Sequence, residues 1–128
     1  MNTDMTQMMG EFIGTMILVL LGDGVCAAVN LNKSKAQASG WIVIAFGWGL
    51  AVTMAVYISG FMGPAHLNPA VSLAMAMTGA IGWNLVIPFI IAQMLGAIVG
   101  AVLVWLTYLP HWNVTKDQGA ILGTFATG

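Results

Sequence analysis

Three long apolar stretches separated by short polar segments dominate the pattern along the chain. Residues 8–29 are mostly apolar, residues 40–59 carry no charged side chain, and residues 85–109 form a third such run. Each stretch has about the 20 residues that a helix needs to cross the hydrocarbon core of a bilayer. The polar run 30–39 is typical of a short loop in water. The pattern therefore predicts three transmembrane helices.

A fourth apolar segment, residues 60–79, has a different pattern. Glycines and a proline interrupt its first part, and then Asn68 offers a helix N-cap with Pro69 at the first helical position. The helix that begins there reaches Gly79 and is too short to cross a bilayer. Irregular backbone at membrane depth is tolerated only where protein buries it or water lines it. We therefore expect a re-entrant loop and half-helix, with residues 60–67 facing a cavity.

Small residues mark one face of the first and third apolar runs. Ala92, Gly96 and Gly100 recur every four positions, and Gly10 and Gly14 have the same spacing. Residues four apart lie on the same side of a helix. Small side chains in that arrangement let a second helix approach closely within a membrane. Both runs are therefore expected to pack against neighbouring helices.

Residues 110–128 are expected to form a polar or interfacial connection with no further element. Pro110 follows the third apolar run, and proline does not continue a helix. No other long apolar run occurs before Gly128. We therefore expect a chain that stops within a connecting loop.

The composition supports a membrane protein and argues against several other classes. Hydrophobic residues make up 59% of the 128 residues and charged residues 5%, which is more apolar surface than a water-soluble domain of this size could bury. The net charge is −1 and the only basic residues are three lysines, so no nucleic-acid partner is expected. Cys26 is the single cysteine, which excludes a disulfide framework or cysteine metal site. No catalytic pair or phosphate-binding loop indicates an enzyme, and no cofactor or metal is expected.

The strongest motif is the run GPAHLNPAV at residues 63–71. It resembles the first signature of the aquaporin superfamily, the major intrinsic proteins, whose members carry Asn-Pro-Ala twice. Further matches are EFIGT at 11–15, WGL at 48–50, Gln93 and GTFAT at 123–127. Together they cover nearly the whole chain. One departure is Pro64, where the family pattern more often has glycine.

The resemblance implies an all-α membrane protein that forms one aquaporin-like repeat. Such a repeat has three transmembrane helices and a re-entrant half-helix that carries the first Asn-Pro-Ala motif, and two inverted repeats make a pore. The second motif and the filter arginine of the family are absent, since the sequence contains no arginine. We therefore expect residues 1–128 to be the N-terminal half of a channel whose second repeat is missing.

The resemblance also assigns the residues that line the pore. The pore motif is Asn68, Pro69 and Ala70. Asn68 would donate its side-chain N–H to a passing oxygen while the positive end of the half-helix disfavours cations. The acceptors opposite an apolar wall would be main-chain carbonyls, those of Ala65, His66 and Leu67. The alternative is that Asn68 and Pro69 only start a helix.

Three further positions have roles in the family. Trp48 matches the selectivity filter, where glycerol-conducting members commonly have tryptophan; alternatively, it packs or faces lipid. Glu11 is ionisable within a span, which indicates a functional role, and the family uses it to brace the re-entrant loop. Gln93 resembles a second brace, and the alternative is a hydrogen bond between helices.

The expected function is a passive channel in the plasma membrane, of the glycerol-facilitator (aquaglyceroporin) branch. Glycerol and other small neutral solutes would be the permeants, with water left open, and complete channels would form homotetramers with lipid around them. Three alternatives remain: a truncated fragment without transport activity, half of a water-selective aquaporin, and two copies of the chain that pair head to tail to mimic the inverted repeat. Two indications of the orientation in the membrane conflict. The family topology puts Lys33, Lys35 and Lys116 on the outer side, whereas the positive-inside rule puts lysines on the cytoplasmic side.

Overall fold

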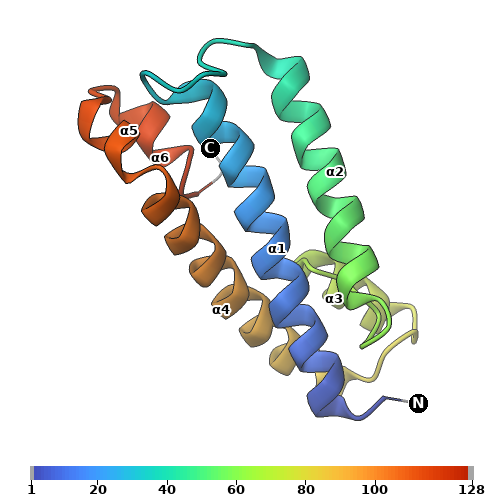
Figure 1. Ribbon diagram of the computed structural model, residues 1–128. Helices are drawn as coiled ribbons and strands as arrows, with labels where there is room; N and C mark the ends of the chain where they lie inside the picture. The colour runs from blue at the N-terminus through green and yellow to red at the C-terminus, as the bar shows by residue number, and fades with distance from the viewer. Residues whose placement is uncertain (1, 127–128) are drawn as a thin grey trace.

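The computed structural model describes residues 2–126, and all regular structure within that range is helical (Figure 1). Thr127, the last residue of the GTFAT match, lies outside the described residues. Six helices follow one another along the described chain: α1 (Asp4–Asn30), α2 (Trp41–Ser59), α3 (Pro69–Met77), α4 (Trp83–Thr107), α5 (Leu109–Val114) and α6 (Gln118–Leu122).

Three of these helices, α1, α2 and α4, are long and apolar enough to cross a membrane. At 1.5 Å per residue their 27, 19 and 25 residues span about 40, 28 and 38 Å. The nine residues of α3 span only about 14 Å. The expected fold class, an all-α membrane protein with three spanning helices and one half-length helix, is confirmed.

The first helix begins earlier than the apolar pattern indicates. It starts at Asp4 rather than near residue 8, because Thr3 caps it by accepting a hydrogen bond from the amide of Thr6 at 3.2 Å. A capped start supports a polar first turn. The other two spanning helices begin and end within a few residues of the expected bounds.

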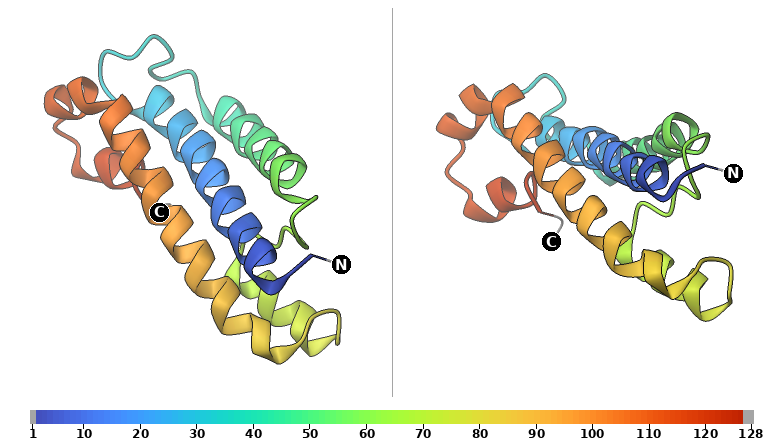
Figure 2. Two further views of the ribbon diagram at one scale, coloured as in Figure 1. Left: turned by 60° about the horizontal axis from the view of Figure 1, so that its bottom comes forward. Right: turned by 90° about the horizontal axis from the view of Figure 1, so that it is seen from below.

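The long helix α1 lies between α2 and α4 and packs against both (Figures 1 and 2). Glycines make these approaches close. A Cβ placed on Gly96 or Gly100 of α4 would meet the backbone of α1, at the carbonyl oxygens of Phe12 and Met16 respectively. On the other side, a Cβ on Gly14 would meet Ser59 of α2. Gly96 and Gly100 of the α4 stripe therefore lie in the α1–α4 contact, whereas Gly14 of α1 lies against α2.

Residues 110–126 differ from the expectation of a connection without structure of its own. Asp117 caps α6 by accepting hydrogen bonds from the amides of Gly119 and Ala120 at 2.9 and 3.3 Å. Trp112 and Ile121 from the two short helices pack on a buried cluster of Ala27, Leu31 and Val104. These contacts are with α1 and α4, far away in sequence, so the local pattern did not indicate them.

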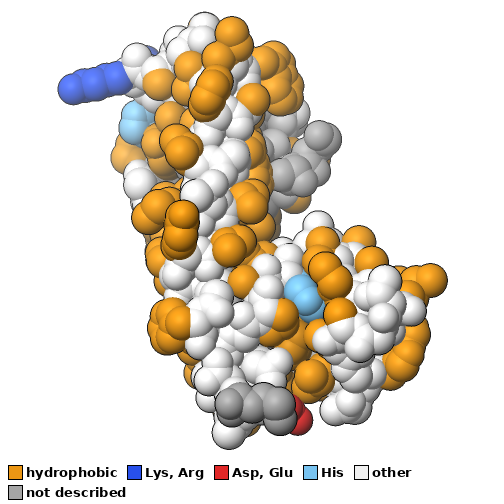
Figure 3. All heavy atoms as spheres, turned by 90° about the vertical axis from the view of Figure 1, so that its right-hand side faces the viewer, with side chains coloured by type: hydrophobic (Ala, Val, Ile, Leu, Met, Phe, Trp, Pro, Cys, Tyr) orange, Lys and Arg blue, Asp and Glu red, His pale blue; other side chains and the backbone are white. Residues whose placement is uncertain are grey.

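The two polar connections meet at one end of the molecule. The amide of Asn32, after α1, donates to Thr115 Oγ1 at 2.9 Å. Lys33, Lys35 and Lys116 therefore share that end. The space-filling view shows hydrophobic side chains spread along the length of one side, with lysine extending from this end (Figure 3). Exposed apolar side chains on the long helices fit contact with lipid.

Replacing Gly96 with alanine tests the α1–α4 contact. We expect Gly96→Ala to lower the free energy of unfolding by about 1–3 kcal/mol, because its methyl group has no room against the α1 backbone. The matched control is Gly49→Ala in α2, where a Cβ meets nothing within 4 Å, and helix propensity predicts a gain of up to about 1 kcal/mol. Detergent-denaturation curves followed by circular dichroism measure both. Equal effects of the two substitutions would contradict this packing.

Candidate functional site

The start of α3 leaves one polar group facing outward. Asn68 has an extended backbone and caps the helix by accepting a hydrogen bond from the amide of Ala70 to Oδ1 at 2.8 Å. Pro69 takes the first helical position. The side chain of Asn68 is exposed, and its Nδ2 donates to no group within residues 2–126. The cap thus uses the oxygen of the amide and leaves its N–H donors available beside the positive end of the helix.

The three residues before Asn68 adopt an unusual backbone. Ala65 and Leu67 have φ angles of 51° and 56°, in the left-handed region that non-glycine residues rarely occupy. Glu11 of α1 stabilises this path. Its Oε1 accepts the amide of His66 and its Oε2 accepts the amide of Leu67, each at 2.7 Å. In a planar trans peptide the C=O points opposite to the N–H. The carbonyls of Ala65 and His66 are therefore turned away from Glu11.

A second set of hydrogen bonds ties Glu11 to α3 and α4. Gln93 Nε2 donates to Glu11 Oε2 and to Ser72 Oγ, both at 2.9 Å. Ser72 Oγ lies 3.1 Å from Nδ1 of His66, whose ring sits edge-on to Phe89. Glu11, Gln93 and Ser72 are each at most 1% exposed. One buried network therefore joins α1, the re-entrant loop, α3 and α4.

Sequence reasoning missed Ser72. It lies four residues after Asn68 and is the single polar residue within the nine residues of α3. A lone serine on an apolar helix at membrane depth is a signal that could have found it, because its hydroxyl needs a partner there. Its partners, Gln93 and His66, lie on other elements and were not predictable from spacing.

Trp48 lies apart from this network, and its indole packs on α1. Its indole Nε1 donates to Cys26 Sγ at 3.3 Å. The ring lies over Gly22, where a Cβ would collide with its six-membered part. Gly22 and Glu11 are eleven residues apart in the same helix, about 16 Å along its axis. The structure thus brings eight of the nine expected site residues together around the loop and half-helix. Trp48 lies apart from them, further along α1 at the level of Gly22.

Comparisons with known proteins identify the family of this chain. The family model described as major intrinsic protein matches residues 2–126. The chain belongs to the major intrinsic protein family. Among solved structures, the aquaglyceroporin from Plasmodium falciparum superposes with a TM-score of 0.83 and 32% identity over 92% of this chain and 48% of that one.

Relatives in the major intrinsic protein family include named glycerol facilitators. Glycerol uptake facilitator protein 3 of Lactiplantibacillus plantarum is 64% identical over 95% of this chain and 51% of its own length. The glycerol uptake facilitator protein of Bacillus subtilis is 56% identical over 97% of this chain and 45% of its own. This member of the family therefore spans about half the length of the curated relatives it matches.

Removing one oxygen acceptor from Glu11 tests the network in this family member. We expect Glu11→Gln to lower the free energy of unfolding by about 2–4 kcal/mol, because an amide group cannot accept both loop amides and the N–H of Gln93. Amide hydrogen exchange at His66 and Leu67 should become faster. The control is Asp4→Asn, an exposed acid of the same helix, with a cost below about 1 kcal/mol. Unchanged exchange at both amides in Glu11→Gln would refute the role of Glu11.

Replacing the sulfur acceptor tests the hydrogen bond between Trp48 and Cys26. We expect Cys26→Ala to shift the indole N–H resonance of Trp48 in an NMR spectrum, because the indole loses its acceptor. Cys26→Ser should return the signal toward its original position, since a hydroxyl also accepts. The resonance of Trp41, which is exposed at the start of α2, is the internal control. A Trp48 resonance at the same position in both variants and the unsubstituted chain would rule out the hydrogen bond.

Proposed function

We propose that this chain forms one repeat of a passive plasma-membrane channel for glycerol and other small neutral solutes. The second repeat would complete the pore. Support comes from relatives that are named glycerol uptake facilitators, and from three helices able to span a bilayer. The observation that carries the proposal is the half-helix whose exposed Asn68 keeps its N–H donors available at membrane depth.

Asn68 would act as the donor to a permeating molecule. Its Oδ1 is engaged by Ala70, so Nδ2 is the part of the amide that can meet an oxygen of the solute. The positive end of α3 makes this point unfavourable for cations, while a neutral solute pays no such cost. The motif Asn68, Pro69 and Ala70 would thus select for neutral molecules that accept hydrogen bonds.

The carbonyls of Ala65, His66 and Leu67 would act as the acceptors along the solute path. Support comes from Glu11, which takes the amides of His66 and Leu67 and so turns two of the carbonyls outward. A row of acceptors leading to the Asn68 donor suits a molecule whose hydroxyl groups both donate and accept. Polyols such as glycerol have this chemistry. Glu11 and Gln93 would maintain the loop without touching the solute.

Trp48 would contribute to solute selection at a second level of the pore. Its indole presents a flat apolar surface, and its contacts with Gly22 and Cys26 limit its movement. A flat ring suits the carbon side of a polyol, whereas a narrow opening lined by polar groups suits water alone. Complete channels would assemble as homotetramers in the bilayer, as expected for the family.

The test is solute entry into vesicles, followed by stopped-flow light scattering. Vesicles would contain this chain together with the half of the Lactiplantibacillus plantarum relative that the chain does not match. We expect glycerol to enter well above the rate of empty vesicles, and Asn68→Leu to reduce the excess rate by about tenfold, because one hydrogen bond to the solute, roughly 1.4 kcal/mol, is lost. Asn113→Ala, an exposed asparagine in α5, is the control and should leave entry unchanged.

The same vesicles separate the alternatives. Fast water entry without glycerol entry would favour half of a water-selective channel and would contradict the glycerol proposal. Glycerol entry at the rate of empty vesicles, with both halves inserted, would contradict channel activity in this assembly. Vesicles with this chain alone show whether a single repeat conducts without the second half.

A further inference from the structure

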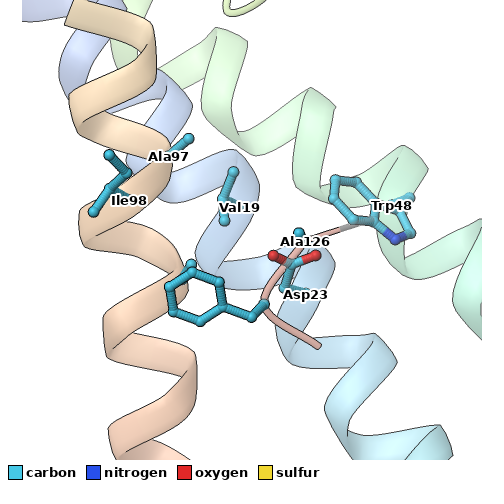
Figure 4. Close-up of a pocket in the computed structure, with 8 residues that line it drawn as sticks. Val19, Asp23, Trp48, Ala97, Ile98 and Ala126 are labelled. Atoms are coloured by element: carbon cyan, nitrogen blue, oxygen red, sulfur yellow. The ribbon is translucent and has the colours of Figure 1, made fainter. Parts of the chain in front are cut away.

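A second polar feature lies on the α1–α4 face, at the level of Trp48. A recess of about 430 Å³ opens there between α1, α2, α4 and the segment after α6 (Figure 4). Its walls are almost entirely apolar: Val19, Ala97, Ile98, Ala101, Phe125 and Ala126, with Trp48 at one side. Asp23 of α1 is the one ionisable residue in this lining.

Asp23 has no partner for one of its oxygens. The side chain is 2% exposed, and Oδ1 is buried without a hydrogen-bond donor within the described part of the chain. In Figure 4 Asp23, Trp48 and Ala126 border the same space. A buried carboxylate oxygen without a donor is costly, and the cost is greater at membrane depth, where water is scarce. Because no group within residues 2–126 donates to this oxygen, Asp23 is expected to meet a donor from outside the described part of the chain.

The chain itself offers no suitable cation. It contains no arginine, and its three lysines lie at the end beyond α1 and α4. None of them pairs with Asp23 in the described residues. The described residues thus supply no donor, and a molecule or segment that enters the recess from outside would supply one.

The position of the recess indicates what kind of occupant fits. At the level of Glu11, α3 packs on α4 and its loop is tied to α1, so one end of the α1–α4 face is already covered. Asp23 lies twelve residues further along α1, about 18 Å away along the axis. Here the described residues place no helix comparable to α3 on the apolar wall, which the segment after α6 borders with Phe125 and Ala126. The relatives are about twice as long as this chain, and so have further segments that could cover it.

We propose that Asp23 is the polar anchor for the second half of the channel. A segment of that half enters the recess, buries the walls formed by α1 and α4, and donates a hydrogen bond to Asp23 from an amide, ammonium or guanidinium group. The same segment covers the open side of Trp48. This inference rests on the proposed two-repeat channel. It adds the residue that holds the two repeats together at the level of Trp48.

The proposal predicts opposite effects of one substitution in two settings. In the chain alone, Asp23→Val should raise resistance to detergent denaturation, because it removes a buried oxygen without a donor. With the second half of the Lactiplantibacillus plantarum relative, the same substitution should weaken association at least about tenfold, since the incoming donor loses its acceptor. Asp23→Asn keeps a carbonyl oxygen and should retain most of the association. A residue with only an internal structural role would change both readouts in the same direction.

Photo-crosslinking locates the occupant. A crosslinking amino acid at Ile98, inside the recess, should capture the second half, whereas one at Ile91, on the same helix and outside the recess, should not; the two positions are 52% and 53% exposed. Capture of lipid alone at Ile98, or association that is unchanged in Asp23→Val, would overturn the proposal. Association of the two halves without glycerol entry would support Asp23 as the anchor and would contradict the proposed transport function instead.

Discussion

The arrangement of the functional site depends on a single buried carboxylate, that of Glu11. It accepts two amides of the re-entrant loop and the side chain of Gln93, with distances of 2.7–2.9 Å. The loop has two non-glycine residues at positive φ, a conformation that persists only when its surroundings compensate for the strain. Without Glu11, the amides of His66 and Leu67 would be buried without acceptors. The orientation of the loop carbonyls and the position of Asn68 both follow from this contact.

The membrane explains why such a network is needed. Lipid supplies no hydrogen bonds, so every polar group of an irregular segment must find a partner within the protein or in a water-lined space. The Nε2 of Gln93 and the hydroxyl of Ser72 find partners inside the protein, while Asn68 leaves its N–H donors exposed. The long helices contribute little polarity and instead approach closely at glycines. The buried hydrogen bonds of Glu11, Gln93 and Ser72 thus hold the re-entrant loop.

Two acidic residues of α1 illustrate the difference between a completed and an open contact. Glu11 and Asp23 are almost equally buried, at 1% and 2% exposure. Glu11 meets three donors from two other segments of this chain, the re-entrant loop and α4, whereas Asp23 has an oxygen without any donor in the described residues. The first belongs to the loop and half-helix of this repeat. The second lies beside Trp48, where the wall of the recess is still open, and this contrast supports an external partner at that level.

The sequence by itself determined the three spans, the half-helix and the family, because these depend on local patterns. Apolar run length predicted the three spans, and Asn68 with Pro69 predicted where the half-helix begins. Only the tertiary structure decided three other features. These are the two short helices after residue 108, the hydroxyl of Ser72 between Gln93 and His66, and the packing of Trp48 on Gly22 and Cys26. Each of them depends on groups from separate helices, and hydrophobic periodicity carries no information about which distant side chains meet across a helix contact.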